Sequence, residues 1–152
     1  MNRDLHFWFF SKMMSGPLGQ YLIKRRNYFV NGVMPRAVGN KDSLSEEAME
    51  HYRRAQPSPA EREANAALPG YIVGATDWLR TIWDGRSAFN EKPTLILWGN
   101  KDIAFRTKEL ERWKSEFVDA KVHEFADCGH FLSEEAPDRI LPLIRAFMNG
   151  GD

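Results

Sequence analysis

Apolar residues in the first part of the chain recur at helical spacing, and turns separate the runs. Three helices are expected, at residues 4–14, 18–26 and 71–83. Two Ser-x-x-Glu patterns, at 43–46 and 58–61, predict capping boxes, in which the two side chains satisfy free amides at a helix start. The pattern therefore predicts a helical segment over residues 1–92.

The hydrophobic pattern changes after Pro93. Residues 94–98 form a continuous apolar run, as expected for a strand buried on both faces of a parallel sheet. An amphipathic helix over 107–117, a second strand over 121–125 and a last helix over 137–148 follow. Strand, helix and strand with a short crossover predict a right-handed βαβ unit. We therefore expect an α/β fold whose second part is residues 93–152.

Composition narrows the possible partners. Hydrophobic residues make up 43% of the 152 positions, which is ordinary for a globular protein, and 21 basic residues balance 21 acidic ones. Nothing indicates a nucleic-acid or membrane partner, and no apolar run approaches the roughly 20 residues that cross a bilayer. The single cysteine, Cys128, cannot form an internal disulfide, so a cytoplasmic location is expected.

Two loops carry the residue types of a hydrolytic site. WGNKD, at residues 98–102, follows the first predicted strand, and DCGHF, at 127–131, follows the second. Ligand sites in open α/β sheets lie beyond the carboxyl ends of the strands, so adjacent parallel strands would bring these loops together. Asp102 could then accept a hydrogen bond from one imidazole nitrogen of His130 and leave the other nitrogen free as a base.

Other residues near His130 offer alternatives. Asp127 is a rival acid, but it lies too near His130 along the chain to reach the far side of the ring easily. Cys128 beside His130 makes a Cys–His nucleophilic pair conceivable, although a base needs its partner across the site. A metal site from His123, Cys128 and His130 lacks any recognised ligand spacing, and none is expected. Glu134 and Glu135 are expected to favour the N-terminus of the last helix through its dipole.

These stretches resemble a known family. PTLILWGNKDIAF with ADCGHFLSEEAPDRI is similar to the C-terminal section of haloalkane dehalogenases, which are α/β-hydrolases. The upstream stretches MSGPLGQYLIKRRNYFVNGVMPRAV and SEEAMEHYRRAQPSPAER resemble the helical cap of that family. The resemblance implies the C-terminal part of an α/β-hydrolase fold, with a cap segment in residues 1–92 and a terminal βαβα core part in residues 93–152.

The resemblance also implies an activity. It is closest to the subgroup whose acid follows the seventh strand, which makes Asp102 the catalytic acid and His130 the base. In the family an aspartate displaces the halide of a small apolar haloalkane, and the histidine activates the water that hydrolyses the resulting alkyl ester. Neither a cofactor nor a metal is implied.

The nucleophile of the family is not recognisable in the chain. No small-x-nucleophile-x-Gly turn follows a strand, and no His-Gly-Asn-Pro-like loop occurs. Trp8 and Trp98 do not match the halide-binding positions of the family. We therefore expect a truncated chain that is inactive alone and that binds a missing N-terminal half or self-associates.

Two other interpretations remain open. An epoxide hydrolase with a similar cap would need two cap tyrosines, for which the candidates are Tyr21, Tyr28, Tyr52 and Tyr71. In the other interpretation the chain is no enzyme but a fragment that binds its other half. The coding sequence immediately upstream would separate these possibilities, because it would or would not encode the nucleophile turn.

Overall fold

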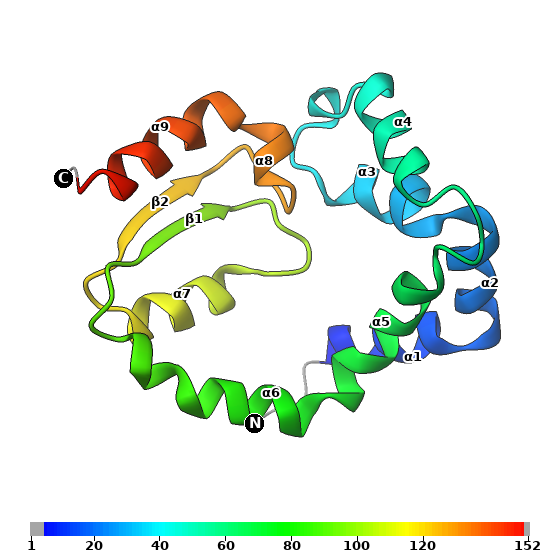
Figure 1. Cartoon of the computed structure of the whole chain (residues 1–152), viewed down its shortest axis with the longest axis horizontal. Helices are drawn as coiled ribbons and strands as arrows, with labels where there is room; N and C mark the ends of the chain where they lie inside the picture. The colour runs from blue at the N-terminus through cyan, green and yellow to red at the C-terminus, as the bar shows by residue number, and fades with distance from the viewer. Residues whose placement is uncertain (1–4, 151–152) are drawn as a thin grey trace. The chain divides into compact units, whose positions relative to one another are not determined.

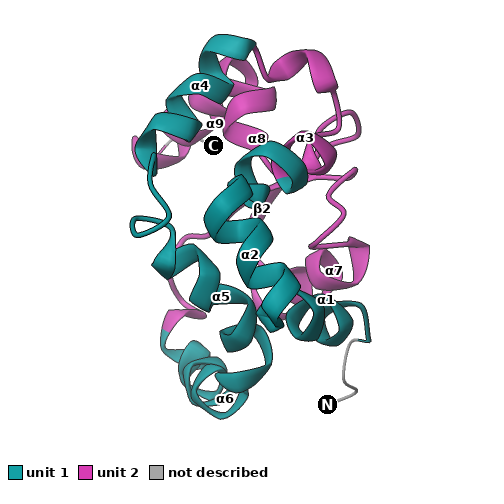
Figure 2. Ribbon diagram, turned by 90° about the vertical axis from the view of Figure 1, so that its right-hand side faces the viewer, with its two compact units in different colours: residues 1–33, 46–88 teal, residues 34–45, 89–152 magenta. Residues whose placement is uncertain are grey.

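The computed structural model describes residues 5–150, which form two compact units (Figure 2). The first unit holds the residues up to Val33 together with Glu46–Ala88, and the second holds Met34–Ser45 together with the residues from Phe89 onward. Met34–Ser45 thus belongs with residues far along the chain. The predicted division into cap and core at residues 92 and 93 stays a prediction, and the compact units follow a different partition.

The regular elements described in the first unit are all helices, joined by turns (Figure 1). Its elements are α1 (Leu5–Ser15), α2 (Pro17–Arg26), the π-helix η1 (Phe29–Val33), α4 (Glu46–Ala55), α5 (Glu63–Gly74), α6 (Thr76–Asp84) and the 3-10 helix η3 (Gly85–Phe89), which runs into the second unit. α1 packs chiefly on α5 and α2. Met14, Ile23 and Ala66 are buried at the centre of this unit. The buried hydroxyl of Ser11 donates to the carbonyl of Pro69 at 2.6 Å, which joins α1 to α5.

The helix predictions for this unit are largely confirmed. α1 and α2 match the first two predicted helices, although Asp4, the first residue of the predicted 4–14 helix, lies outside the described residues. The predicted 71–83 helix is interrupted at Ala75, where α5 ends and α6 begins. Within residues 5–150 no helix has the length and apolar content needed to cross a membrane.

The reciprocal hydrogen bonds of one predicted capping box form, but in the turn that precedes α5 and not at a helix start, since α5 begins at Glu63. The amide of Ser58 donates to the Glu61 carboxylate at 2.7 Å, and the amide of Glu61 donates to the Ser58 hydroxyl at 3.3 Å. The box predicted at 43–46 is wrong, because the Ser43 hydroxyl donates to the carbonyl of Asn40 and Glu46 pairs with Arg53 instead.

The second unit contains a two-stranded parallel sheet. β1 (Leu95–Gly99) pairs in register with β2 (Lys121–Phe125), and the crossover between them contains α7 (Thr107–Glu116). α7 and α9 (Pro137–Met148) lie on opposite sides of the sheet (Figure 1). The unit is completed by α3 (Met34–Ala37), the 3-10 turn η2 (Lys41–Ser43) and α8 (Leu132–Glu135). The predicted βαβ unit is confirmed.

The core of the second unit lies between the sheet and α9. Phe125, Cys128, Ala136 and Ile140 are buried there, and on the other side Leu110 of α7 is buried. Phe125 is the last residue of β2, and Cys128 lies in the loop beyond it. The ends of the strands and the loops that follow them are therefore the best-packed part of the unit.

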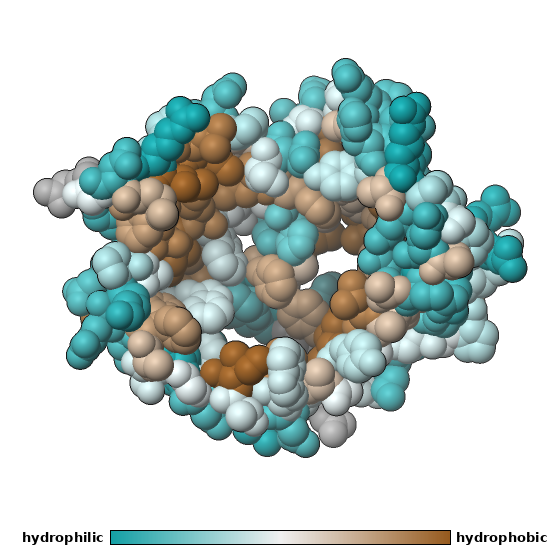
Figure 3. Space-filling view, viewed as in Figure 1, coloured by the Kyte–Doolittle hydropathy of each residue, from teal (hydrophilic) through white to brown (hydrophobic). Residues whose placement is uncertain are grey.

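β1 is less buried than the sequence predicted. Residues 95–98 are half-buried, and within residues 5–150 β2 is the only strand that pairs with β1. In a parallel ladder alternate residues bond to one neighbour, so the backbone groups of Leu95 and Leu97 point away from β2. Hydrophobic side chains are visible at the surface over α9 and the sheet (Figure 3). β1 therefore has a helix on each face of its sheet (Figure 1), but it is buried less completely than the sequence predicted.

Candidate active site

Asp102 and His130 lie together beyond the carboxyl ends of β1 and β2. The Nδ1 atom of His130 is 2.9 Å from the Oδ2 atom of Asp102. With Asp102 ionised, Nδ1–H donates this hydrogen bond, and the Nε2 atom carries the lone pair. The side chain of Asp102 is 10% exposed and that of His130 is 33% exposed. The carboxylate is therefore shielded, while water can reach the imidazole.

The loop after β1 fixes the Asp102 carboxylate. Its second oxygen, Oδ1, accepts hydrogen bonds from the amides of Ala104 at 2.7 Å and Phe105 at 3.0 Å. The loop is also tied to its neighbour, because the amide of Lys101 donates to the carbonyl of Cys128 at 2.8 Å. The two oxygens of the carboxylate therefore make separate contacts, since Oδ1 holds the loop and Oδ2 faces the imidazole.

The backbone of His130 is anchored to a distant part of the chain. Its amide donates to the carbonyl of Ala37, at the end of α3, at 2.8 Å. The rings of Phe105 and Phe131 flank the imidazole, with centroids 5.4 Å and 5.2 Å from its own. Among residues 5–150 no hydrogen bond is made to Nε2 of His130, so this nitrogen is open to accept a proton.

Glycines allow three loops to meet backbone to backbone at this point. A Cβ atom on Gly99 would lie 2.2 Å from the carbonyl oxygen of Gly129. On Gly129 it would lie 2.3 Å from the carbonyl oxygen of Ala37, and on Gly39 it would lie 2.3 Å from that of Asp127. Real Cβ contacts are not this short, so larger residues would force the loops apart. The close approach sets the distance between the acid loop and the histidine loop.

The structure gives Asp127 and Cys128 other partners than His130. Arg139 donates to both carboxylate oxygens of Asp127 at 3.0 Å, and the same nitrogen lies 2.8 Å from the Cys128 sulfur. The hydrogen bond from Arg139 lowers the pKa of Asp127. Burial raises the pKa of the Cys128 thiol, which makes it a poor nucleophile. Neither residue has the geometry of the acid or of a nucleophile.

Glu135 contacts the site in a way that its position in the sequence did not reveal. It was expected to act only on the N-terminus of the last helix. Its carboxylate instead accepts hydrogen bonds from the amides of Gly129, Gly39 and Asn40, at 2.8, 2.6 and 3.2 Å. No sequence pattern predicts these contacts, because Gly39 and Gly129 belong to loops that are far apart along the chain.

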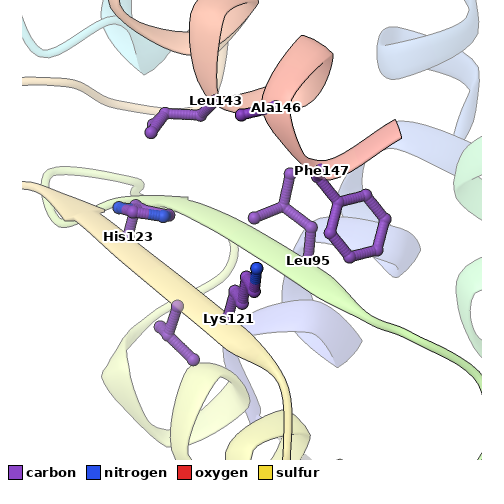
Figure 4. A pocket seen from close by; sticks show the side chains of 7 residues that line it. Leu95, Lys121, His123, Leu143, Ala146 and Phe147 are labelled. Atoms are coloured by element: carbon purple, nitrogen blue, oxygen red, sulfur yellow. The ribbon is translucent and has the colours of Figure 1, made fainter. Parts of the chain in front are cut away.

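A separate cavity of the second unit lies between the sheet and α9 (Figure 4). It is lined by Leu95, Lys121, Val122, His123, Leu143, Ala146 and Phe147. Leu95 and Lys121 are the first residues of their strands, so the cavity opens at the other end of the sheet from Asp102. His6 and His51 are exposed on α1 and α4. Within residues 5–150 no group of three His, Cys, Asp or Glu side chains is placed to hold a metal ion.

Comparison with known proteins identifies the family. The family model described as alpha/beta hydrolase fold matches residues 23–137. The chain therefore belongs to the α/β-hydrolase fold family. It is 40% identical, over 137 residues, to haloalkane dehalogenase 2 of Mycobacterium bovis, an alignment that covers 89% of this chain and 47% of that protein. The predicted resemblance to haloalkane dehalogenases is thus confirmed, and the chain spans about half the length of the curated relatives it matches.

Shorter matches reach other enzymes. A cis-3-alkyl-4-alkyloxetan-2-one decarboxylase of Shewanella oneidensis is 45% identical over 60 residues, which cover 40% of this chain and 19% of that protein. Epoxide hydrolase 3 of Mus musculus is 28% identical over 99 residues, which cover 60% of this chain and 27% of that protein.

A solved structure supports the fold. The crystal structure of DBJA, in a deletion mutant, superposes with a TM-score of 0.80 at 20% identity over 99% of this chain and 53% of that one. The predicted fold class is confirmed: the chain has the α/β-hydrolase fold, in a mostly helical portion with a short parallel sheet.

Proposed function

We propose that the chain supplies the acid and the base of a haloalkane dehalogenase-type hydrolase. The observation that carries this proposal is the 2.9 Å contact between Oδ2 of Asp102 and Nδ1 of His130; with Asp102 ionised, Nδ1 donates this hydrogen bond and Nε2 keeps its lone pair. A base needs this tautomer, because the nitrogen that receives the proton must hold a lone pair. The fixed carboxylate stabilises the imidazolium ion that forms.

The proposed step is hydrolysis of an alkyl ester on an enzyme carboxylate. Nε2 of His130 takes a proton from water as the water oxygen attacks the ester carbonyl. The tetrahedral intermediate collapses, the bond to the alkoxide oxygen breaks, and the imidazolium returns the proton to that oxygen. Alcohol leaves, and the carboxylic acid that remains loses its proton to solvent, which restores the enzyme carboxylate. The step exchanges no electrons, and side chains alone supply its base and its ester, so we propose no cofactor and no metal.

The extent of the similarity favours haloalkanes among the substrates considered. The dehalogenase relative aligns with 89% of this chain, whereas the oxetanone decarboxylase aligns with 40% and the epoxide hydrolase with 60%. The dehalogenase match is therefore the most extensive of the three, and it argues for a small apolar halogenated substrate. Epoxide hydrolysis remains the second candidate.

The nucleophile and the halide ligands would come from a segment that these 152 residues do not contain. The dehalogenase relative is about twice as long as the aligned region, which leaves room for such a segment. We propose that the chain alone is inactive, that it binds the nucleophile-bearing half, and that it resides in the cytoplasm.

The test begins with the DNA upstream of the coding sequence. If it encodes an Asp-Trp nucleophile turn, that segment is co-expressed with this chain and halide release from a bromoalkane is measured. We expect turnover from the wild-type pair, and with His130→Ala a single halide per site followed by a stall. Asp127→Asn serves as the control, because it removes a neighbouring carboxylate that pairs with Arg139. Steady turnover by His130→Ala would show that the base lies elsewhere.

A further inference from the structure

The carboxylate of Glu135 joins two loops on either side of the His130 backbone. One oxygen, Oε1, accepts from the amide of Gly129, the residue immediately before His130, at 2.8 Å. The other, Oε2, accepts from the amides of Gly39 at 2.6 Å and Asn40 at 3.2 Å. Between them the amide of His130 itself donates to the carbonyl of Ala37. The Glu135 side chain thus links the end of α8 to two loop segments, Gly129–His130 and Gly39–Asn40.

The three donors require a carboxylate in particular. Backbone amides only donate, and an ionised carboxylate only accepts, with two oxygens available at once. A glutamine would offer one oxygen and turn an NH2 group towards amides that also donate. Hydrogen bonds to a charged acceptor are also stronger than neutral ones. Since the two loops approach each other at glycines, neither has a side chain of its own that could replace this link.

We propose that Glu135 is a positioning residue for His130: it holds the Gly129–His130 backbone against the Gly39–Asn40 loop, so that Nδ1 meets Asp102. This inference rests on the proposed role of His130 as the base. Without the link, the His130 loop keeps its bond to Ala37 but loses the fixed position of Gly129. The imidazole then turns away from the carboxylate, and Nε2 is no longer reserved for the proton of water.

The test measures the tautomer of His130 in the full 152-residue chain, with the nucleophile-bearing segment added where the chain alone lacks the amide signals of β1 and β2. Imidazole proton–nitrogen correlation spectra of the nitrogen-15-labelled chain distinguish a ring protonated at Nδ1 from one protonated at Nε2, and His130→Ala assigns the signal. We expect the Nδ1-protonated form in the wild type and its loss in Glu135→Gln, with the amide signals of β1 and β2 unmoved. Asp138→Asn, which removes an exposed carboxylate in the first turn of α9, should match the wild type.

Each result decides the question. An Nδ1-protonated His130 in Glu135→Gln, or its absence from the wild type, overturns the proposal. If Glu135→Gln loses the sheet signals, Glu135→Asp takes its place, because it keeps the charge but is too short to span both loops. Full retention of the tautomer in that variant would then overturn the proposal. No turnover is measured, so a failure of the dehalogenase chemistry would leave this result unchanged.

Discussion

Replacing Asp102 by asparagine tests the candidate site most sharply, because the structure predicts which way the new amide turns. Oδ1 of Asp102 accepts from two backbone amides, at 2.7 and 3.0 Å. Only the carbonyl oxygen of an asparagine can satisfy these donors. Its NH2 group is therefore forced into the place of Oδ2, 2.9 Å from Nδ1 of His130. Nδ1 must then accept, which moves the ring proton to Nε2.

The size of the effect distinguishes this inversion from a simple loss of charge. A hydrogen bond to a charged group contributes about 1.5–3 kcal/mol, so its loss alone would slow ester hydrolysis roughly 10- to 150-fold. An inverted tautomer protonates the nitrogen that must act as the base, and in a serine protease the equivalent change lowers kcat by about 10⁴. That factor corresponds to about 5 kcal/mol. We expect Asp102→Asn to fall in this larger range.

The assay follows halide and alcohol separately in an active enzyme that contains this chain. Asp102→Asn should release one halide per site at the normal rate and then stall, with the alkyl ester detectable on the protein by mass spectrometry. Asp127→Asn, the matched control, should turn over normally. Hydrolysis of the ester by Asp102→Asn at the wild-type rate would refute Asp102 as the acid. A loss of only 10- to 150-fold would refute the inverted tautomer.

Three further predictions concern the chain as it stands. The purified chain should release no halide from a bromoalkane above background, since covalent catalysis needs an attacking group; sustained release that His130→Ala abolishes would contradict this. The hydrogen bond from Arg139 holds the pKa of Asp127 in the folded chain below its value in the unfolded chain. The ion pair therefore stabilises the fold at pH values above the pKa of the unfolded chain, and this stabilisation is lost as the pH falls through the pKa of the folded chain. Asp127→Asn should therefore be less stable than the wild type to urea at pH 7, and the gap should close at a pH acidic enough to protonate Asp127 in both states; a constant gap would count against the pairing. Because β2 is the only strand among residues 5–150 that pairs with β1, the chain should self-associate, or be partly molten, unless a nucleophile-bearing segment is supplied. A clean monomer in size-exclusion chromatography with a sharp melting transition would rule this out.

Local patterns in the sequence were enough to predict most of the secondary structure. The bounds of β2 and α9 agree with the prediction, because a proline begins α9 and apolar residues recur regularly within both elements. The break at Ala75 directly follows Gly74, the last residue of α5, a helix-end signal that the prediction of a helix at 71–83 overlooked. The apolar run at 94–98 predicts that β1 can be deeply buried, but the burial reached also depends on neighbouring strands, and within residues 5–150 β1 pairs with β2 alone.

The candidate site shows a similar division. The meeting of Asp102 and His130 follows from topology, because parallel neighbouring strands place their following loops side by side. The role of Met34–Ser45 and the contacts of Glu135 could not be predicted. The bond from Gly39 to Glu135 spans 96 positions, and single backbone amides leave no mark on hydropathy or periodicity. Such contacts become visible only when the chain is folded.

The interleaving of the two units has a consequence for inheritance. The carbonyl of Ala37 and the amides of Gly39 and Asn40 support the histidine loop, yet they are encoded among the codons of the helices. A recombination event between codons 92 and 93 would replace the helices of one homologue and would also replace this support. Proteins that result from such an exchange would keep Asp102 and His130 unaltered but would take the supporting loop at 37–40 from the other homologue. Exchanges that leave codons 34–45 with the C-terminal part would preserve the match, so surviving chimaeras should favour two crossovers that spare this segment.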